Sequence, residues 1–382
     1  MLPQLNHWPV NWADGMKITR SHLLATDDAT RDLARDAAGS LLSGLDYGLL
    51  TPAAGHESPL TITCDGDSVV LSVCRAITPG GARIELSTNP TDSLHLPLST
   101  VRESWVRTGL SAGYVVVEVN PFDPQPHGEP NPDEEPLRFP SVRPNLRISA
   151  VSVDKLHTTL ASAYHIPVAK LLLANGVFSL AIDYLPPTRA VGSHQDYRDL
   201  YHKLRKRLGE LLQYATAIVV RVRTNARSGQ PNALATSIGY VAEACLHSLG
   251  NQLDDFQLRG LHDAPVGLVS TGKRLARHLQ IAIQSTPDRE REAMFNYIKN
   301  WTSVTPVEWE TALQQLLDTP YEHADCQPVM LAFVRLNECL IKLFSKLSEL
   351  NYHERSKDEF FVEKQDVPAP KPAGIRSGFW SK

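Results

Sequence analysis

The change of hydrophobic period at Pro186-Pro187 constrains the fold of this chain more than any other feature. Before it, apolar and polar residues alternate in short runs such as 60–64, which is the period of a half-buried strand. After it, leucines recur every three or four residues, as at Leu200, Leu204 and Leu208, which is the period of an amphipathic helix. With 382 residues and 42% hydrophobic content, each half has enough chain for its own core. We therefore expect an α+β protein in which an antiparallel β-sandwich precedes an α-helical bundle.

Turn residues divide the first half into strands. Asp65-Gly66, Pro79-Gly80-Gly81 and Asn175-Gly176 each separate two apolar runs, and such turns favour hairpins. The expected strands are 60–64, 69–73, 83–86, 114–119, 146–153, 166–173 and 177–184. The stretch 120–144 holds eight prolines, which remove ladder donors, so we expect a long exposed loop there. That loop is either a solvated insertion or a docking loop for a neighbouring subunit.

A first helix is expected from Ser21, ahead of the strands. Its leucines form a partial apolar stripe, and its charged residues lie on the solvent side. The stripe is Leu23, Leu24, Leu33, Leu41 and Leu42, and the solvent side is Asp27, Asp28, Arg31, Asp32, Arg35 and Asp36. The bundle helices are expected at 195–222, 233–256, 266–285, 286–301, 305–317 and 328–350.

These patterns divide the chain into four regions. They are an N-terminal arm (1–20), a β-sandwich shell domain (21–190), the helical bundle (191–350) and a flexible Pro-rich C-terminal tail (351–382). The tail is too rich in proline to pack a core, so we expect it to be extended.

The sequence carries no signature of a catalytic or metal site. It has no nucleophile elbow, zinc motif or phosphate loop, and its five cysteines include no CxxC pair. We therefore predict no enzyme activity, no catalytic residue, no metal and no cofactor. A net charge of −4 gives no reason to expect nucleic acid as a partner. Without a signal peptide or a run of about 20 apolar residues, a cytoplasmic protein is expected that reaches the membrane only through partners.

Four short motifs carry a resemblance to a known family. They are Trp12-Ala13-Asp14-Gly15-Met16 followed by His22, His165-Ile166-Pro167-Val168-Ala169, Asp183-Tyr184-Leu185-Pro186-Pro187, and Pro320-Tyr321-Glu322-His323-Ala324-Asp325. In this order they resemble TssK, the baseplate protein of the bacterial type VI secretion system, over roughly residues 8–350. Arg20-Ser21-His22-Leu23 departs from the family's usual Pro-Gln-His-Phe. About thirty residues follow Leu350, so the resemblance is to a short form without the usual C-terminal head domain.

The resemblance implies a trimeric structural adaptor. TssK-like proteins attach to the TssF-like and TssG-like wedge proteins through a sandwich similar to the shoulder of phage receptor-binding proteins. Their bundle extends the trimer, and their head domain binds the membrane complex. For this chain the wedge contact is expected from the N-terminal half, and a membrane-anchor contact from the C-terminal end.

The candidate partner-binding residues are apolar or aromatic residues near the two ends of the chain. They are Trp8, Trp12, Met16 and His22 in the N-terminal segment, and Phe379 and Trp380 in the tail. Trp12 either anchors a partner or covers its own domain's core, because aromatic residues serve both roles. Phe379-Trp380 is either a docking motif or a plain chain end. Two other functions stay open: a phage-type receptor or carbohydrate-binding module, and a hydrolase with scattered carboxylates.

Overall fold

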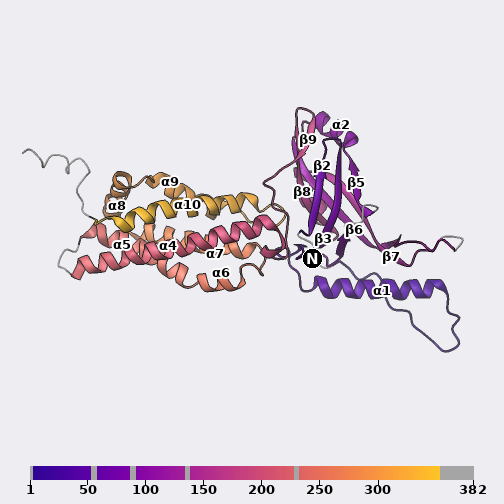
Figure 1. Cartoon of the computed structure of the whole chain (residues 1–382). Coiled ribbons are helices and arrows are strands. Elements are labelled where there is room, and N and C mark those ends of the chain that lie inside the picture. The colour runs from indigo at the N-terminus through magenta and orange to yellow at the C-terminus, as the bar shows by residue number, and fades with distance from the viewer. Residues whose placement is uncertain (1–2, 53–57, 87–91, 134–137, 228–231, 353–382) are drawn as a thin grey trace, which may run out of the picture.

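The structure, a computed structural model, describes residues 3–52, 58–86, 92–133, 138–227 and 232–352. An upright β-sandwich stands beside a long helical bundle, and helix α1 (Arg20–Gly39) lies below the sandwich (Figure 1). The predicted α+β class, with antiparallel strands before helices, is confirmed.

The first sheet is organised around one long strand, β3 (Ser68–Ile77). Every neighbour pairs antiparallel to it, namely β1 (Gly48–Leu49), β2 (Leu60–Cys64), β4 (Arg83–Leu86) and β5 (Leu94–Pro97). The β2–β3 hairpin closes at Asp65-Gly66 as predicted, and Gly66 takes a φ of 92°, which favours glycine.

The second sheet has the order β7-β6-β8-β9 and is also antiparallel. Its strands are β6 (Ala112–His127), β7 (Ser141–Ser152), β8 (His165–Ala174) and β9 (Val177–Leu180). Leu71 and Ile84 of the first sheet share one core with Val115, Val117 and Ile166 of the second, all fully buried. This shared core makes the two sheets a sandwich.

Two short helices of this half were not predicted. α2 (Ser99–Thr108) buries Trp105 against Phe178 of β9, with ring centroids 5.3 Å apart. α3 (Val153–Leu160) follows β7, and the predicted strand 146–153 ends one residue earlier than expected. Both helices span three turns or fewer, so their period was too short to separate from strand alternation.

The proline-rich stretch is not the loop that we expected. β6 and β7 continue their ladder through it, with Pro124 opposite Pro144 and Pro126 opposite Val142. Pro124, Pro126 and Pro144 lie at alternate positions of the ladder. At such positions the backbone nitrogen points away from the partner strand, so no ladder hydrogen bond is lost. β8 covers β6 only up to Glu118, which leaves this outer side of β6 free of a further strand.

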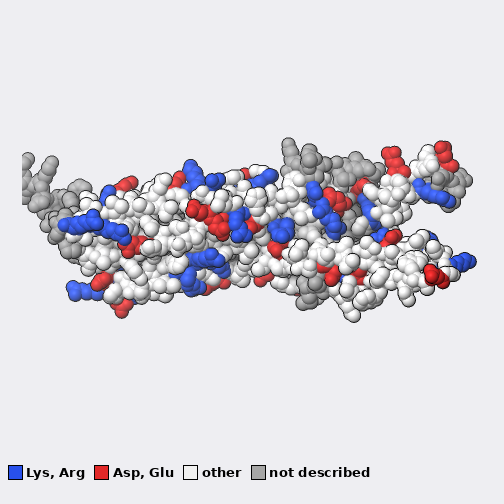
Figure 2. Space-filling view, turned by 90° about the horizontal axis from the view of Figure 1, so that it is seen from below, with Lys and Arg blue, Asp and Glu red and all other residues white. Residues whose placement is uncertain are grey.

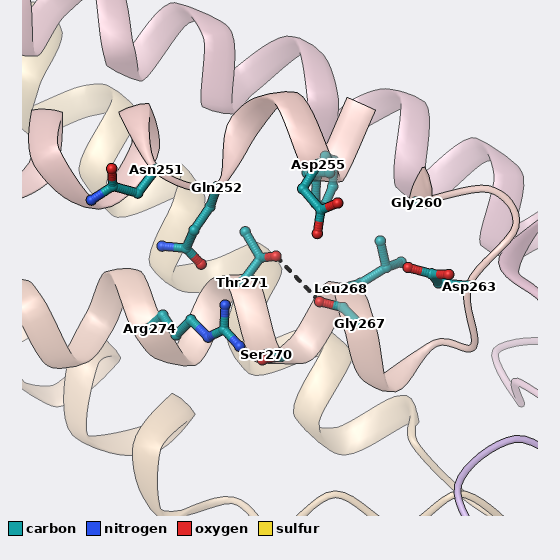
Figure 3. Close-up of a pocket in the computed structure, with 11 residues that line it drawn as sticks. Asn251, Gln252, Asp255, Gly260, Asp263, Gly267, Leu268, Ser270, Thr271 and Arg274 are labelled. Carbon is teal, nitrogen blue, oxygen red and sulfur yellow. Dashed lines mark hydrogen bonds between the residues drawn. The ribbon is translucent and has the colours of Figure 1, made fainter. Parts of the chain in front are cut away.

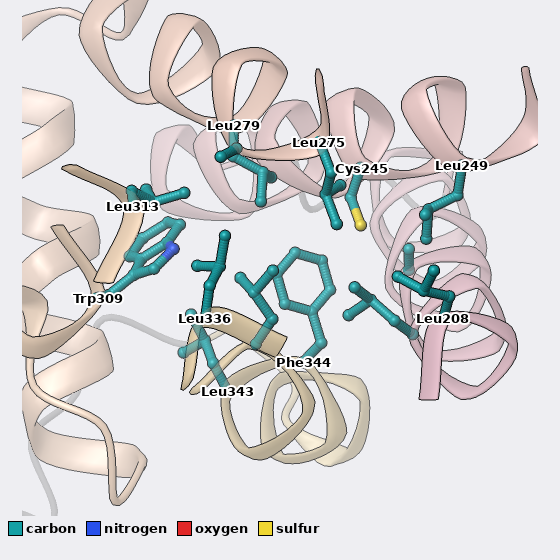
Figure 4. Packing of buried hydrophobic residues seen from close by; sticks show 14 of the residues in the cluster. Leu208, Cys245, Leu249, Leu275, Leu279, Trp309, Leu313, Leu336, Leu343 and Phe344 are labelled. Atoms are coloured by element: carbon teal, nitrogen blue, oxygen red, sulfur yellow. The ribbon is translucent and has the colours of Figure 1, made fainter. Parts of the chain in front are cut away.

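The second half is a bundle with its own core. Its elements are the 3₁₀ turn η2 (Val191–Ser193) and the helices α4 (Gln195–Arg227), α5 (Ala233–Gly250), α6 (Leu253–Arg259), α7 (Val266–Ser285), α8 (Asp288–Trp301), α9 (Pro306–Asp318) and α10 (Gln327–Glu349). Leu208, Cys245, Leu275, Leu336 and Phe344 meet at its centre (Figure 4). The helix predicted at 233–256 is two helices, broken at Asn251-Gln252.

The loop between α9 and α10 joins the bundle to the sandwich. The backbone oxygen of Ala324 accepts a hydrogen bond from the Tyr184 hydroxyl at 2.7 Å. Asp325 accepts one from the Tyr114 hydroxyl at 2.6 Å and pairs with Lys170 Nζ at 2.9 Å. His323 is buried and bonds the Tyr47 carbonyl at 2.8 Å. We call this contact the joint; it fixes the bundle against both sheets.

The motif at Pro186-Pro187 also lies in the joint. The Pro187 carbonyl accepts the N–H of Leu49 in β1 at 2.8 Å, and the N–H of Arg189 bonds the Leu49 carbonyl at the same distance. A Cβ on Gly48 would meet the Pro187 oxygen at 2.1 Å, so only glycine fits there. Two of the motifs found in the sequence therefore build the same joint.

We predict that Asp325→Ala destabilises the joint. The variant removes a charged acceptor from Tyr114 and Lys170, so the free energy of unfolding should fall by about 1.5–3 kcal/mol. Urea unfolding measures this loss. Asp318→Ala is the matched control, because Asp318 bonds the exposed Gln314 on α9 and should cost less than about 0.5 kcal/mol. Equal losses in the two variants would contradict the account.

A second prediction concerns the pH dependence of the joint. Burial lowers the pKa of His323, and the Tyr47 carbonyl and Asp46 offset this only in part. The unfolded state therefore binds more protons below about pH 6.5, so the contribution of His323 is complete above that pH and is lost as the pH falls through the folded pKa.

The measurement is the melting temperature of the wild type and of His323→Gln at about pH 7.5 and 5.5. The wild type should lose more on acidification than the variant, which has no titrating ring. Burial also lowers the pKa of His194, so part of the loss remains in both proteins. An identical loss in both would show that His323 does not carry the dependence.

Candidate protein-interaction site

A buried ion pair on α1 fixes the N-terminal arm. Asp32 is fully buried, and its carboxylate accepts the backbone N–H groups of Asn6 and His7, each at 2.9 Å. Arg35, one turn further along α1, pairs with Asp32 at 2.6 Å. Burial alone would raise the pKa of Asp32, but these backbone bonds and the Arg35 charge outweigh it and hold that pKa below its ordinary value.

The same pair attaches α1 to the sandwich. Arg35 Nη1 donates to the Tyr164 hydroxyl at 2.7 Å, and its guanidinium lies 5.7 Å from the centre of the Phe122 ring on β6. The His7 ring also stacks on Phe122, with ring centroids 4.3 Å apart. A Cβ on Gly81 would meet the Arg35 carbonyl at 2.3 Å, so the β3–β4 turn touches the α1 backbone directly.

The orientation of α1 differs from the one predicted, although Asp27 is exposed as expected and Asp28, Arg31, Asp36 and Leu42 are half-buried. Asp32 and Arg35, expected on the solvent side, are buried together with Ala29 and Gly39. The leucines of the expected core stripe face outward instead. Small residues at positions 29 and 39 let the helix approach the sandwich, and the satisfied ion pair can be buried between them. That small-residue spacing was the signal in the sequence that the leucine pattern concealed.

The arm, α1 and the loop after α1 expose eight large apolar side chains. We call this set the arm–α1 surface; its members are Trp8, Trp12, Ile18, Leu23, Leu24, Leu33, Leu41 and Leu45. Trp8 and Leu41 are 72% and 78% exposed. Seen from below, most of the face consists of residues other than Lys, Arg, Asp and Glu, with charged residues scattered among them (Figure 2). Many exposed large apolar side chains in one part of a chain favour an interaction site.

The predicted arm residues come together at the start of α1. Gly15 has a φ of 78°, and Met16 N–H bonds the Ala13 carbonyl at 3.2 Å, so the Trp-x-x-Gly-Met motif forms a tight turn. The turn brings Trp12 edge-on to His22, with ring centroids 5.9 Å apart. His22 also closes a capping box with Thr19. Trp8 and Trp12 are exposed, while Met16 and His22 are half-buried.

Phe379 and Trp380, the predicted residues of the tail, lie outside the described residues. Sequence reasoning missed Ile18 and the outward leucines as members of the surface. It placed those leucines in a core, because an apolar stripe on a helix is buried more often than exposed.

Within the described ranges, no group of three or more His, Cys, Asp or Glu side chains is arranged to hold a metal ion. A cavity of about 140 Å³ lies between α6 and α7, where Gln252, Asp255, Thr271 and Arg274 face it (Figure 3). The Thr271 hydroxyl donates a hydrogen bond to the Gly267 carbonyl, and the Asp255 carboxylate lies 3.7 Å from the Arg259 guanidinium. This set offers no activated nucleophile. No helix in the described part of the chain is long and apolar enough to cross a membrane.

Comparison with known proteins places this geometry in a class. No family model matches the sequence, and no curated protein matches it. A crystal structure of TssK aligns with a TM-score of 0.50 and 15% identity, covering 87% of this chain and 68% of that one. A chain of the type VI secretion baseplate complex aligns with a TM-score of 0.48, 15% identity and coverages of 88% and 99%. A chain of the TssK-TssF-TssG baseplate subcomplex aligns with a TM-score of 0.47 and 15% identity, covering 90% of this chain and 100% of that one.

The fold thus defines a two-part protein in which a β-sandwich is hydrogen-bonded to a helical bundle. The similarity to the crystal structure of TssK covers both parts and confirms, for the fold, the resemblance found in the sequence motifs.

We predict that Asp32→Ala releases the arm. Removing the carboxylate frees the N–H groups of Asn6 and His7 and leaves Arg35 buried without its main partner, a loss of about 3–5 kcal/mol. Hydrogen exchange should show deprotection of Asn6 and His7. Asp28→Ala is the matched control, because Asp28 pairs with Arg31 on the partly exposed side of the helix and contributes roughly 0–1 kcal/mol. Wild-type exchange in Asp32→Ala would contradict this role.

Proposed function

We propose that this chain is a non-enzymatic structural adaptor of the type VI secretion baseplate. In this proposal it forms a homotrimer that links wedge proteins to the membrane-anchoring part of the machine. It works in the cytoplasm and reaches the inner face of the cytoplasmic membrane through its partners, with no nucleic acid and no cofactor.

The observation that carries the proposal is the fold similarity to the crystal structure of TssK, which extends over 87% of the chain. The arm–α1 surface supports it, because exposing Trp8 and five leucines to water is unfavourable unless a partner covers them. The joint supports it as well, since a linker between two machine parts must hold its two ends in a fixed orientation.

Each of the four regions has a role in the proposal. The arm (1–20) and the sandwich domain (21–190) bind the TssF-like and TssG-like wedge proteins. The bundle (191–350) extends the trimer, and the tail (351–382) carries the membrane-side contact through Phe379 and Trp380. Co-purification of the full chain with both wedge proteins tests the first role. A chain that retains neither wedge protein would contradict the proposal.

We predict that Trp12→Ala weakens wedge binding. Burial of this indole on a partner would contribute about 2–3 kcal/mol, so the dissociation constant should rise roughly 30- to 150-fold. The melting temperature should hardly change, because Trp12 is 48% exposed in the free chain.

The matched control is Ile182→Ala. Ile182 is also apolar and 97% exposed, but it lies in the loop after β9. It should leave wedge affinity unchanged. Equal weakening by both variants, or by neither, would show that the arm–α1 surface is not the wedge contact.

A further inference from the structure

An open groove runs between α9 and α10 on the side of the bundle. Its volume is about 430 Å³, and Val304, Val307, Ala312 and Cys339 form its apolar floor. Val307 is 72% exposed, and Cys339 is partly exposed in a protein whose other bundle cysteines are buried. We call this feature the α9–α10 groove. Its floor is apolar surface that no described part of the chain covers.

The rim of the groove carries two acidic residues, Glu308 and Glu338, and two basic ones, so its formal charges balance, but only the acids are hydrogen-bonded within the described residues. Its two carboxylates are engaged: Glu338 bonds Arg207 at 2.9 Å, and Glu308 bonds the Thr305 N–H at 2.8 Å within a capping box. Arg335 and Lys342 are exposed on α10 and form no salt bridge or hydrogen bond with the described residues. A segment that fits this groove therefore needs apolar side chains between two acids.

The sequence after α10 has this composition. Asp358-Glu359-Phe360-Phe361-Val362-Glu363 places two aromatic residues and a valine between acidic residues. This segment lies outside the described residues, so its sequence and its distance from the groove carry the argument. Other parts of the tail are rich in proline or basic residues and lack this pattern.

Chain length allows the segment to reach the groove. The last described residue, Tyr352, is buried, and its carbonyl accepts a bond from Asn232 at 2.8 Å. Seven extended residues from there to Glu359 span up to about 23 Å. Lys342 precedes Tyr352 by ten residues, which is roughly 15 Å along the axis of α10. The segment can therefore fold back along α10.

The spacing of charges also agrees. Arg335 and Lys342 are seven residues apart on α10, which is about 10.5 Å along the axis. Glu359 and Glu363 are four residues apart, which is about 13 Å in an extended chain. A chain that returns from the end of α10 meets Lys342 first and Arg335 second. Glu359 would then face Lys342 and Glu363 would face Arg335.

We propose that residues 358–363 of this same chain dock in the α9–α10 groove, with Phe361 on its apolar floor, Phe360 against its wall and the flanking glutamates at Lys342 and Arg335. This inference concerns the free chain and does not depend on the proposed baseplate function. It assigns the acidic part of the tail to the bundle and leaves Phe379 and Trp380 for another contact.

Cys339 provides a direct probe, because a docked segment covers its thiol. Burial raises the pKa of Cys339 to about 11, so labelling by a maleimide is slow and its rate is easily followed by mass spectrometry. Cys64 on β2 is the internal reference, since it is also partly exposed but belongs to the sandwich.

The test compares two double variants of the full chain. Phe360→Ser with Phe361→Ser should raise the labelling rate of Cys339 about ten-fold, because a tethered segment at millimolar effective concentration is docked most of the time. Phe379→Ser with Trp380→Ser is the matched control and should leave the rate at the wild-type value. Cys64 should label equally in all three proteins.

Two results would overturn the proposal. One is equal Cys339 labelling in the wild type and the Phe360/Phe361 variant, which would mean that the groove is open in the free chain. The other is protection that grows with protein concentration, which would mean that a second copy covers the groove. Faster labelling of the wild type at high salt, with no change in the Phe360/Phe361 variant, would support the role of Arg335 and Lys342.

Discussion

The buried pair of Asp32 and Arg35 decides what the N-terminal half can do. Because the carboxylate holds the arm and the guanidinium holds Tyr164 and Phe122, α1 must turn its charged and small residues inward. Its leucines are then left on the outside, next to Trp8 and Trp12. A buried polar contact thus leaves large apolar side chains exposed, and exposed apolar side chains favour an interaction site.

The joint gives this surface a fixed relation to the bundle. The α9–α10 loop reaches both sheets through Ala324, Asp325 and His323. These hydrogen bonds join the core of the bundle to that of the sandwich through one loop.

Sequence periodicity predicted most of this fold. It failed where a residue type has two possible structural roles, as for the prolines of β6 and the leucines of α1. The helix predicted at 266–285 is α7 (Val266–Ser285), because its apolar stripe is buried as the period predicts. The ladder through Pro124 and Pro144 was missed, since proline at alternate positions costs no hydrogen bond. The arm residues were found through their motif, whereas the outward leucines were assigned to a core. Only three-dimensional contacts reveal that Asp32 is satisfied when buried.

We propose that the arm–α1 surface belongs to a subunit of a trimeric adaptor and not to a protein that functions as a monomer. The most direct measurement is the mass of the purified full chain by light scattering over a wide range of concentrations. The account predicts a constant mass of three times the 42.3 kDa chain. A mass of one chain at every concentration would contradict it.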